Sequence, residues 1–305
     1  MTVWTHGPST LPGPWLAFSL PSPPQRVYCR RGRYIWSMRN LTSRLEAPGC
    51  TLAYEDRDGT EPAVVFLHGA GADHVMFTEQ ANAVAGAGRR IVMLDIRAHG
   101  FSRPNTAPLT AEQFVDDIER LIKHRGLIRP VLVGHSLGGN LAQELVRRSP
   151  GSYAGLMVMD STWNTGPLSR LERVLLHLAV PGLALVPAKK LPAVMARVSA
   201  VTETARADAF RAFSQVPKRE FMDIWRATAS LVRPDAGYRT AAPLCLLRGS
   251  ADRTGNISTA MPMWASAEGV KEHVIPGAGH LVSQDAPALV TGELLSFLEK
   301  LDPDR

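Results

Sequence analysis

The segment Val131-Leu-Val-Gly-His-Ser-Leu-Gly-Gly-Asn140 decides the fold of this 305-residue chain. Its first three residues are apolar and mostly β-branched, which is typical of a strand buried on both faces. From Leu141 onward the apolar residues take helical spacing, so a helix is expected to follow. Gly134 and Gly138 flank Ser136 and allow a sharp, strained reversal of the chain between strand and helix. The sequence therefore predicts that the Ser136 hydroxyl is presented at the apex of a tight turn.

Buried strands and amphipathic helices alternate on both sides of this turn. The strand patterns cover residues 50–55, 63–67, 91–94, 131–133, 156–159, 243–247 and 272–275, the first of them as an edge strand; helical patterns reach to about 85 and cover 109–125, 141–148 and 287–301. This alternation predicts an α/β fold with a mostly parallel sheet covered on both faces. Ligands of such sheets bind beyond the carboxyl ends of the strands, where His68, Asp95, Ser136 and Asp160 stand.

Residues 161–239 lack strand patterns. Four helical stretches, at about 168–180, 188–200, 203–214 and 217–231, are expected there. A single crossover between parallel strands needs only a dozen or more residues, so this segment is long enough to form an all-helical subdomain over the sheet. A set of ordinary crossover helices is the alternative.

The first residues differ from the rest of the chain. Residues 1–37 are rich in proline and arginine, and we expect a disordered extension there, with Met38 as the hypothetical physiological start. Six arginines and no acidic residue or lysine lie in residues 1–45, so they account for the net charge of +6: 34 minus 6 leaves 28 basic residues against 28 acidic ones. The folded part is therefore formally neutral, and no nucleic-acid partner is expected.

The cysteines and the hydropathy limit the setting of the protein. Cys29, Cys50 and Cys245 are widely spaced and odd in number, which argues against a disulfide framework and a zinc site and favours a cytoplasmic location. No apolar run reaches the ~20 residues needed to span a bilayer, so membrane insertion is not expected.

Two polar residues later in the chain could activate Ser136. A serine attacks efficiently only when a base accepts its proton and a third group orients that base. Asp252 ends Arg248-Gly-Ser-Ala-Asp252 after one strand, and His280 ends Pro276-Gly-Ala-Gly-His280 after the last strand. Taken alone, Asp252 could instead cap a helix, and His280 could be a surface loop residue.

The G-x-S-x-G turn and the order Ser136, Asp252, His280 resemble the α/β-hydrolase family over about residues 45–301. The resemblance implies a hydrolase core formed by residues 38–160 and 240–305, and a helical cap, residues 161–239, inserted after the sixth strand. It implies a catalytic triad of these three residues, with Asp160 as the alternative acid, because some members use that position. It also implies an oxyanion hole formed by the amides of Leu137 and Ala70, with Gly69 as the second choice for the latter.

A further segment, Asp95 to Ser102, is similar to the family pattern D-x-R-G-H-G-x-S, although Ala98 replaces the usual glycine. Asp95, Arg97 and His99 are interpreted as a scaffold that holds the loops. The predicted substrate-pocket residues are Met76, Phe101, Trp163 and Leu281, each shortly after a catalytic or sheet-end position; core packing is the alternative for each.

These features together predict a cofactor-independent serine hydrolase that cleaves a carboxylic ester or related acyl bond of a small, largely apolar substrate. No metal site and no cofactor are expected, and the sequence carries no signal for the oligomeric state. Two other reactions use the same triad: a cofactor-free haloperoxidase or perhydrolase reaction and C–C bond hydrolysis. A hydrolase-like ligand receptor is the alternative from another class.

Overall fold

The computed structural model describes residues 1, 27–28, 34–35 and 40–302. The chain divides into two units, Met1–Ser37 and Met38–Arg305. In the first unit β1 (Val27–Tyr28) pairs antiparallel with β2 (Tyr34–Ile35). Disorder was expected for residues 1–37, and most of these residues lie outside the part of the chain that the structure describes.

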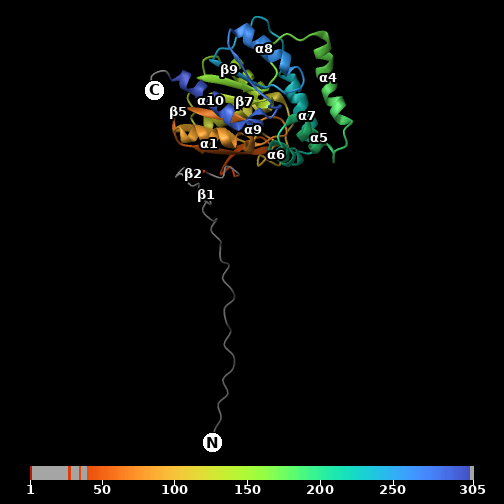
Figure 1. Cartoon of the computed structure of the whole chain (residues 1–305). Coiled ribbons are helices and arrows are strands. Elements are labelled where there is room, and N and C mark those ends of the chain that lie inside the picture. Colours follow the sequence, from red (N-terminus) through yellow and green to blue (C-terminus); the bar gives the residue numbers. More distant parts are fainter. Residues whose placement is uncertain (2–26, 29–33, 36–39, 303–305) are drawn as a thin grey trace. The chain divides into compact units, whose positions relative to one another are not determined.

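The second unit contains an eight-stranded sheet with the order β10-β9-β8-β7-β5-β6-β4-β3 (Figure 1). Its strands are β3 (Ser43–Ala47), β4 (Cys50–Arg57), β5 (Thr60–Leu67), β6 (Arg89–Leu94), β7 (Val131–His135), β8 (Gly155–Met159), β9 (Leu244–Gly249) and β10 (Glu272–Ile275). The six strands from β5 to β10 run parallel, whereas β3 and β4 are antiparallel to their neighbours. The predicted α/β fold with a mostly parallel sheet is confirmed.

The expectation that residues 50–55 form an edge strand is wrong. β4 lies between β3 and β6, and β3 is the edge strand. The side chains of β3 alternate between partly buried and exposed. A strand with only one half-buried face has no continuous apolar run, so it gave no clear signal in the sequence.

Helices cover both faces of the sheet. They are the short 3₁₀ helix η1 (His74–Phe77), α1 (Thr78–Gly86), α2 (Ala111–His124), α3 (Leu137–Arg148), α8 (Ile257–Glu268), α9 (Val282–Asp285) and α10 (Pro287–Leu301). β8 shows the two layers: Gly155 lies against Phe297 of α10, whereas Val158 lies against Gly139 of α3. Residues an odd number apart on a strand point to opposite faces, so α3 and α10 lie on opposite sides of the sheet.

The predicted helical cap follows β8, the sixth strand of the large sheet. It contains α4 (Arg170–Ala184), α5 (Leu191–Ser199), α6 (Glu203–Ser214) and α7 (Lys218–Ser230). α4 was expected to end before Pro181, but it continues to Ala184. The Lys218 ammonium donates to the carbonyls of Ala184 and Val186 and so satisfies acceptors at the end of α4. Among the described helices, none combines the length and the apolar character required to cross a bilayer.

Candidate active site

Ser136 occupies a strained turn between β7 and α3. Its backbone has φ 50° and ψ −115°, a conformation that non-glycine residues rarely adopt. The flanking glycines are required by close packing: a Cβ on Gly134 would lie 2.4 Å from the Gly138 carbonyl oxygen, and one on Gly138 would lie 1.9 Å from that of Leu67. Ser136 is partly exposed, although its neighbours on both sides are buried. The turn therefore presents the hydroxyl as the sequence predicted.

The glycine-rich loop after β5 packs directly beside this serine. A Cβ on Gly69 would lie 3.3 Å from the Ser136 Cβ and 2.6 Å from Nδ1 of His135. Gly69, Ala70 and Ser136 line the same cavity. Leu137 is the first residue of α3, and the first amides of a helix have no partner within the helix. The predicted oxyanion-hole residues thus lie next to Ser136, where the positive end of the α3 dipole favours negative charge.

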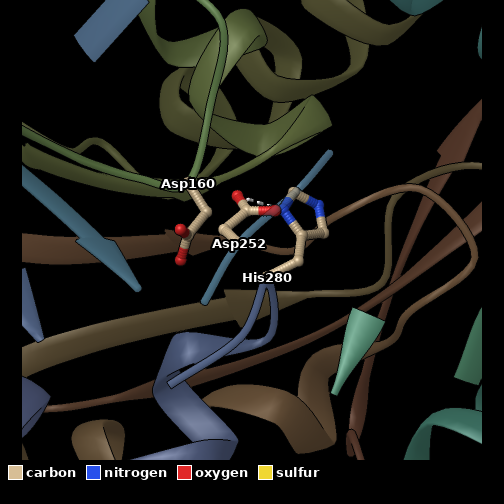
Figure 2. A group of neighbouring side chains, drawn as sticks. All are labelled: Asp160, Asp252 and His280. Carbon is tan, nitrogen blue, oxygen red and sulfur yellow. Dashed lines mark hydrogen bonds and ion pairs between the residues drawn. The ribbon is translucent and has the colours of Figure 1, made fainter. Parts of the chain in front are cut away.

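His280 and Asp252 form a buried pair. The His280 Nδ1 lies 3.0 Å from Oδ2 of Asp252 (Figure 2). Oδ1 of Asp252 accepts a hydrogen bond from the Thr254 amide at 2.8 Å. Burial alone would raise the pKa of Asp252, but the charge and hydrogen bond of His280 and the Thr254 amide hold this pKa well below its usual value. Asp252 is therefore a carboxylate that orients the imidazole and leaves Nε2 to exchange protons.

Asp160 lies on the other side of Asp252 from the imidazole (Figure 2). Its Oδ1 accepts a hydrogen bond from the Gly249 amide at 2.9 Å, and Oδ2 is buried without a hydrogen-bond partner among the described residues. Burial and the negative charge of Asp252 raise the pKa of Asp160 well above its usual value. The raised pKa favours the neutral form of this carboxyl, which suits a structural acid better than the acid of a triad.

The side-chain oxygens and nitrogens of Asp160, Asp252 and His280 lie within 4.8 Å of one another, close enough for a metal ion. Both oxygens of Asp252 already accept hydrogen bonds, and one of them engages the imidazole. Burial and the charge of Asp252 also raise the pKa of Asp160, which disfavours the charged carboxylate that binds divalent ions. The chemistry of this group therefore favours proton transfer over metal binding.

His135, directly before the serine, fixes the loop that carries His280. Its Nε2 donates to the His280 carbonyl oxygen at 2.7 Å, and the two ring centroids lie 4.8 Å apart. Burial lowers the pKa of His135 to about 3, with a smaller contribution from the charge of His280. His135 is therefore a neutral positioning residue.

Asp285 is a second positioning residue, and sequence reasoning missed it. Its carboxylate accepts hydrogen bonds from the amides of Val201, Thr202 and Gly279 at 2.8 to 3.0 Å, and from the Thr202 hydroxyl. Gly279 immediately precedes His280, whereas Val201 and Thr202 connect α5 to α6. Asp285 therefore ties the cap to the catalytic loop, and an acidic residue in a short helix carries no sequence signal for such a role.

The predicted scaffold residues bind the segments around them: Asp95 accepts from the amides of His74 and Phe101, and Arg97 donates to Asp117. His68 Nε2 accepts from the Ile96 amide at 2.8 Å, and His99 Nε2 accepts from the Gly71 amide at 2.9 Å. Burial lowers the pKa of His68 to about 3, so this ring is neutral. Ala98, which departs from the family pattern, has a φ of 66° and thus adopts the conformation that glycine normally supplies.

Two cavities of about 360 and 470 Å³ meet at Ser136 and share Trp225. Pockets of roughly 300–1,000 Å³ suit small organic ligands. The smaller cavity is lined by His280, Leu281 and residues of α5 and α6, such as Met195 and Phe213. The larger one is lined by α4, α7 and the start of α8, with the apolar residues Leu168, Leu175, Leu176, Ala179, Ala229, Val232 and Ile257.

The predicted pocket residues fall in different places. Leu281 lines the smaller cavity, as expected. Trp163 stacks on Trp264 with ring centroids 6.1 Å apart, Met76 is buried in the core, and Phe101 is 45% exposed beside His74. None of these three lines the two cavities at Ser136. The cap helices provide most of the apolar residues of the walls instead, and these look like core residues in the sequence.

The site thus combines a serine at a strand–helix turn, a buried aspartate–histidine pair and an apolar cavity under a helical cap. This combination defines the class of serine-hydrolase-like α/β proteins. The model of the alpha/beta hydrolase family matches residues 64–293, and the chain belongs to this family.

Curated relatives align with only about a third of the chain, and the solved structures that superpose on most of it are 24% identical or less. The sn-1-specific diacylglycerol lipase ABHD11 of Mus musculus is 40% identical over 106 residues, which are 34% of this chain and 34% of that protein. The chain aligns with only about a third of the length of such curated relatives. An esterase from Thermogutta terrifontis superposes with a TM-score of 0.71 at 24% identity, covering 85% of this chain and 99% of its own. A bromoperoxidase from Bacillus anthracis superposes with a TM-score of 0.69 at 19% identity, covering 82% and 96%. At such identities the superpositions establish the fold alone.

Proposed function

We propose that this protein is a cofactor-independent serine hydrolase that cleaves a carboxylic ester or related acyl bond of a small, largely apolar substrate. The observation that carries the proposal is that Ser136, on its strained turn, and His280, hydrogen-bonded to Asp252, line one cavity. We infer that His280 acts as the base for Ser136, and Asp252 is the partner that fixes the tautomer of that base.

The proposed reaction proceeds through an acyl-enzyme. The Ser136 Oγ attacks the carbonyl carbon while its proton passes to Nε2 of His280, and Asp252 stabilises the imidazolium that forms. The amides of Leu137 and Ala70 bind the oxyanion. The imidazolium then protonates the leaving alcohol as the C–O bond breaks. Water, deprotonated by His280, releases the acid and restores Ser136.

The composition of the cavity walls supports an uncharged, apolar substrate. The larger cavity is lined by seven apolar residues with Trp225 and by eight uncharged polar residues, and Glu172 is the one charged residue among the lining residues. The carboxylate of Glu172 is already engaged by the Ser169 amide and Asn256. The smaller cavity adds Arg253, whose guanidinium donates to the carbonyls of Ser250 and Asp252. These walls favour an acyl or alcohol group without charge.

Substitution of the nucleophile tests the proposal. We expect Ser136→Ala to abolish turnover of short p-nitrophenyl esters and labelling by a fluorophosphonate, with unfolding behaviour close to that of the parent chain. Ser152→Ala, at an exposed serine, is the matched control and should retain both. Unchanged turnover in Ser136→Ala would reject the assignment.

A panel of substrates separates the reactions that share this triad. A lactone, a vinylogous diketone and peroxide-dependent bromination accompany the esters, and the proposal requires the largest kcat/KM for an ester. A receptor would react once with the fluorophosphonate or an ester and then stop. Repeated turnover of an ester therefore excludes the receptor alternative.

A further inference from the structure

α4 exposes an apolar stripe to solvent. The exposed side chains are Leu171 (67%), Val174 (53%), Leu175 (55%), Leu178 (54%) and Leu185 (85%). Their spacing of three, four and seven residues places them on one side of the helix, roughly 20 Å long at 1.5 Å per residue. In Figure 1, α4 (green) lies at the margin of the cap. Contiguous apolar surfaces of this kind mark interaction sites.

The rest of the helix is already used in packing. α4 contacts α7, and Leu176 and Val180 line a groove between these helices together with Met222. Leu175 is both half-exposed and part of the lining of the larger cavity at Ser136. The stripe is therefore the unpartnered face of α4, and it is continuous with the wall of the candidate active site.

The charges around the stripe indicate what covers it. Arg170 at its start and Lys189 and Lys190 just beyond its end are exposed. Glu172 is the only acidic residue between 168 and 190, and its carboxylate is bound by the Ser169 amide and by Asn256. An apolar helix face with cations at both ends fits a lipid surface that carries anionic headgroups. Two copies meeting through this stripe would bring the same cations together, which disfavours self-association.

We propose that α4 docks on an anionic lipid surface, with Leu171, Leu178 and Leu185 in the boundary between headgroups and acyl chains. Arg170, Lys189 and Lys190 then face the headgroups. Leu175 places the cavity at Ser136 next to the lipid, so that an ester carried by the lipid phase reaches the site along α4. The docking of α4 on lipid does not depend on the proposed function. Only the proposal that the substrate is an ester carried by the lipid rests on that function.

Vesicle flotation of the full chain tests the docking. We expect flotation with phosphatidylcholine vesicles that contain one quarter phosphatidylserine, weaker flotation with phosphatidylcholine alone, and a decrease at high salt. The triple variant Leu171→Ser, Leu178→Ser, Leu185→Ser should lose binding about tenfold or more, the scale expected when several leucines no longer enter an apolar phase. Leu289→Ser, at an exposed leucine of α10, is the matched control and should bind like the parent chain.

Further variants separate the outcomes. Lys189→Glu with Lys190→Glu should remove the preference for anionic vesicles. The proposal is overturned if the parent chain does not float, if the leucine variant floats equally well, or if light scattering shows a dimer that this variant dissolves. Ser136→Ala should float like the parent chain. Flotation without ester turnover by the parent chain would reject the proposed function alone, and turnover without flotation would reject the docking alone.

Discussion

The two halves of the cap are held to the core in different ways. The segment from α5 to α6 is bound by Asp285, by the ion pair between Arg211 and Asp73 at 2.6 Å, and by a hydrogen bond from Gln284 to Asp208 at 2.7 Å. α4 packs on α7 and reaches the core through Glu172 and Asn256 at 2.9 Å.

The two halves of the cap therefore have different roles at the candidate site. The polar ties of the α5–α6 half end on the loops that carry His280 and the candidate oxyanion hole: Asp285 binds Gly279, and Asp73 follows the Gly69–Gly71 segment. Gly71 itself leaves no room for a Cβ, which would lie 2.3 Å from Phe213. This half therefore fixes the geometry of the chemistry. α4 supplies the wall and the outer face along which substrate would enter.

The largest of these effects is expected at Asp252, the acid that is hydrogen-bonded to His280. Asp252→Asn should reduce kcat for a p-nitrophenyl ester by about 10³- to 10⁴-fold, because the imidazole loses the carboxylate that fixes its tautomer and stabilises its cation. Asp160→Asn should change kcat less than about fivefold, since the raised pKa of Asp160 favours a neutral carboxyl, and an amide is a similar neutral group. A larger loss in Asp160→Asn than in Asp252→Asn would reverse the assignment of the acid.

Removing the carboxylate that ties the cap to the catalytic loop should come next. Asp285→Ala frees the amides of Gly279, Val201 and Thr202, and we expect kcat to fall about 100-fold, the scale for a misplacement of about 1 Å at a reacting group. KM should change little, because Asp285 does not line the cavities at Ser136. A rise in KM at constant kcat would show that Asp285 serves substrate binding instead.

The sequence predicted only some of the elements that position the site and attach the two halves of the cap. The turn at Ser136 was predicted because glycines are required where a Cβ would collide with a neighbouring backbone, as at Gly134 and Gly138, and this requirement is visible in the sequence. The loops ending in Asp252 and His280 were located in the same way, after apolar strands. The ties made by Asp73 and Asp285 depend on backbone amides and side chains far along the chain. No local pattern of apolar or turn residues encodes such partners.

In the cap, the spacing of apolar residues did not predict which of them line the cavities. Met195, Phe213 and Trp225 line the cavities at Ser136, but an apolar residue on a helix has the same spacing whether it faces a core or a pocket. The predicted residues Met76, Phe101 and Trp163 were chosen for their position after sheet-end residues, and packing placed them elsewhere.

A smaller effect, on stability, is expected for Arg211→Met. Burial would raise the pKa of Asp73, but the ion pair with Arg211 outweighs it and holds this pKa below its usual value. Because Arg211 is 42% exposed, the loss should be about 1–2 kcal/mol rather than the about 3–5 kcal/mol of a fully buried pair.

The pH dependence of this loss follows from the lowered pKa. The contribution of Asp73 is fully present above the unfolded pKa of about 3.9, and it disappears as the pH falls through the lower folded value. Chemical denaturation of both chains across this range measures it. Arg226→Met, which breaks the exposed pair with Asp223 on α7, is the matched control, with an expected change below about 0.5 kcal/mol. A difference between parent and Arg211→Met that persists in strong acid would contradict the ion-pair origin.

The smallest effect is expected for Glu172→Ala on α4. This change removes the contact with Asn256 and the capping box with Ser169, which should destabilise the chain by about 1 kcal/mol or less. We expect KM to rise a few-fold for long acyl esters with kcat nearly constant, because a looser α4 alters the wall and not the catalytic loops. Glu203→Ala, in the first turn of α6, is the control. An effect on kcat as large as that of Asp285→Ala would remove the distinction between the halves.

The separate attachment of α4 has a practical consequence for engineering. Asp285 draws its donors from the connection between α5 and α6 and from the glycine before His280, so replacing that half of the cap with one from another hydrolase requires the same donors to be rebuilt. α4 shares none of these bonds. Its exposed face can be varied for new substrate ranges, whereas Glu172 has to be kept, because it binds Asn256 in the loop that follows Asp252.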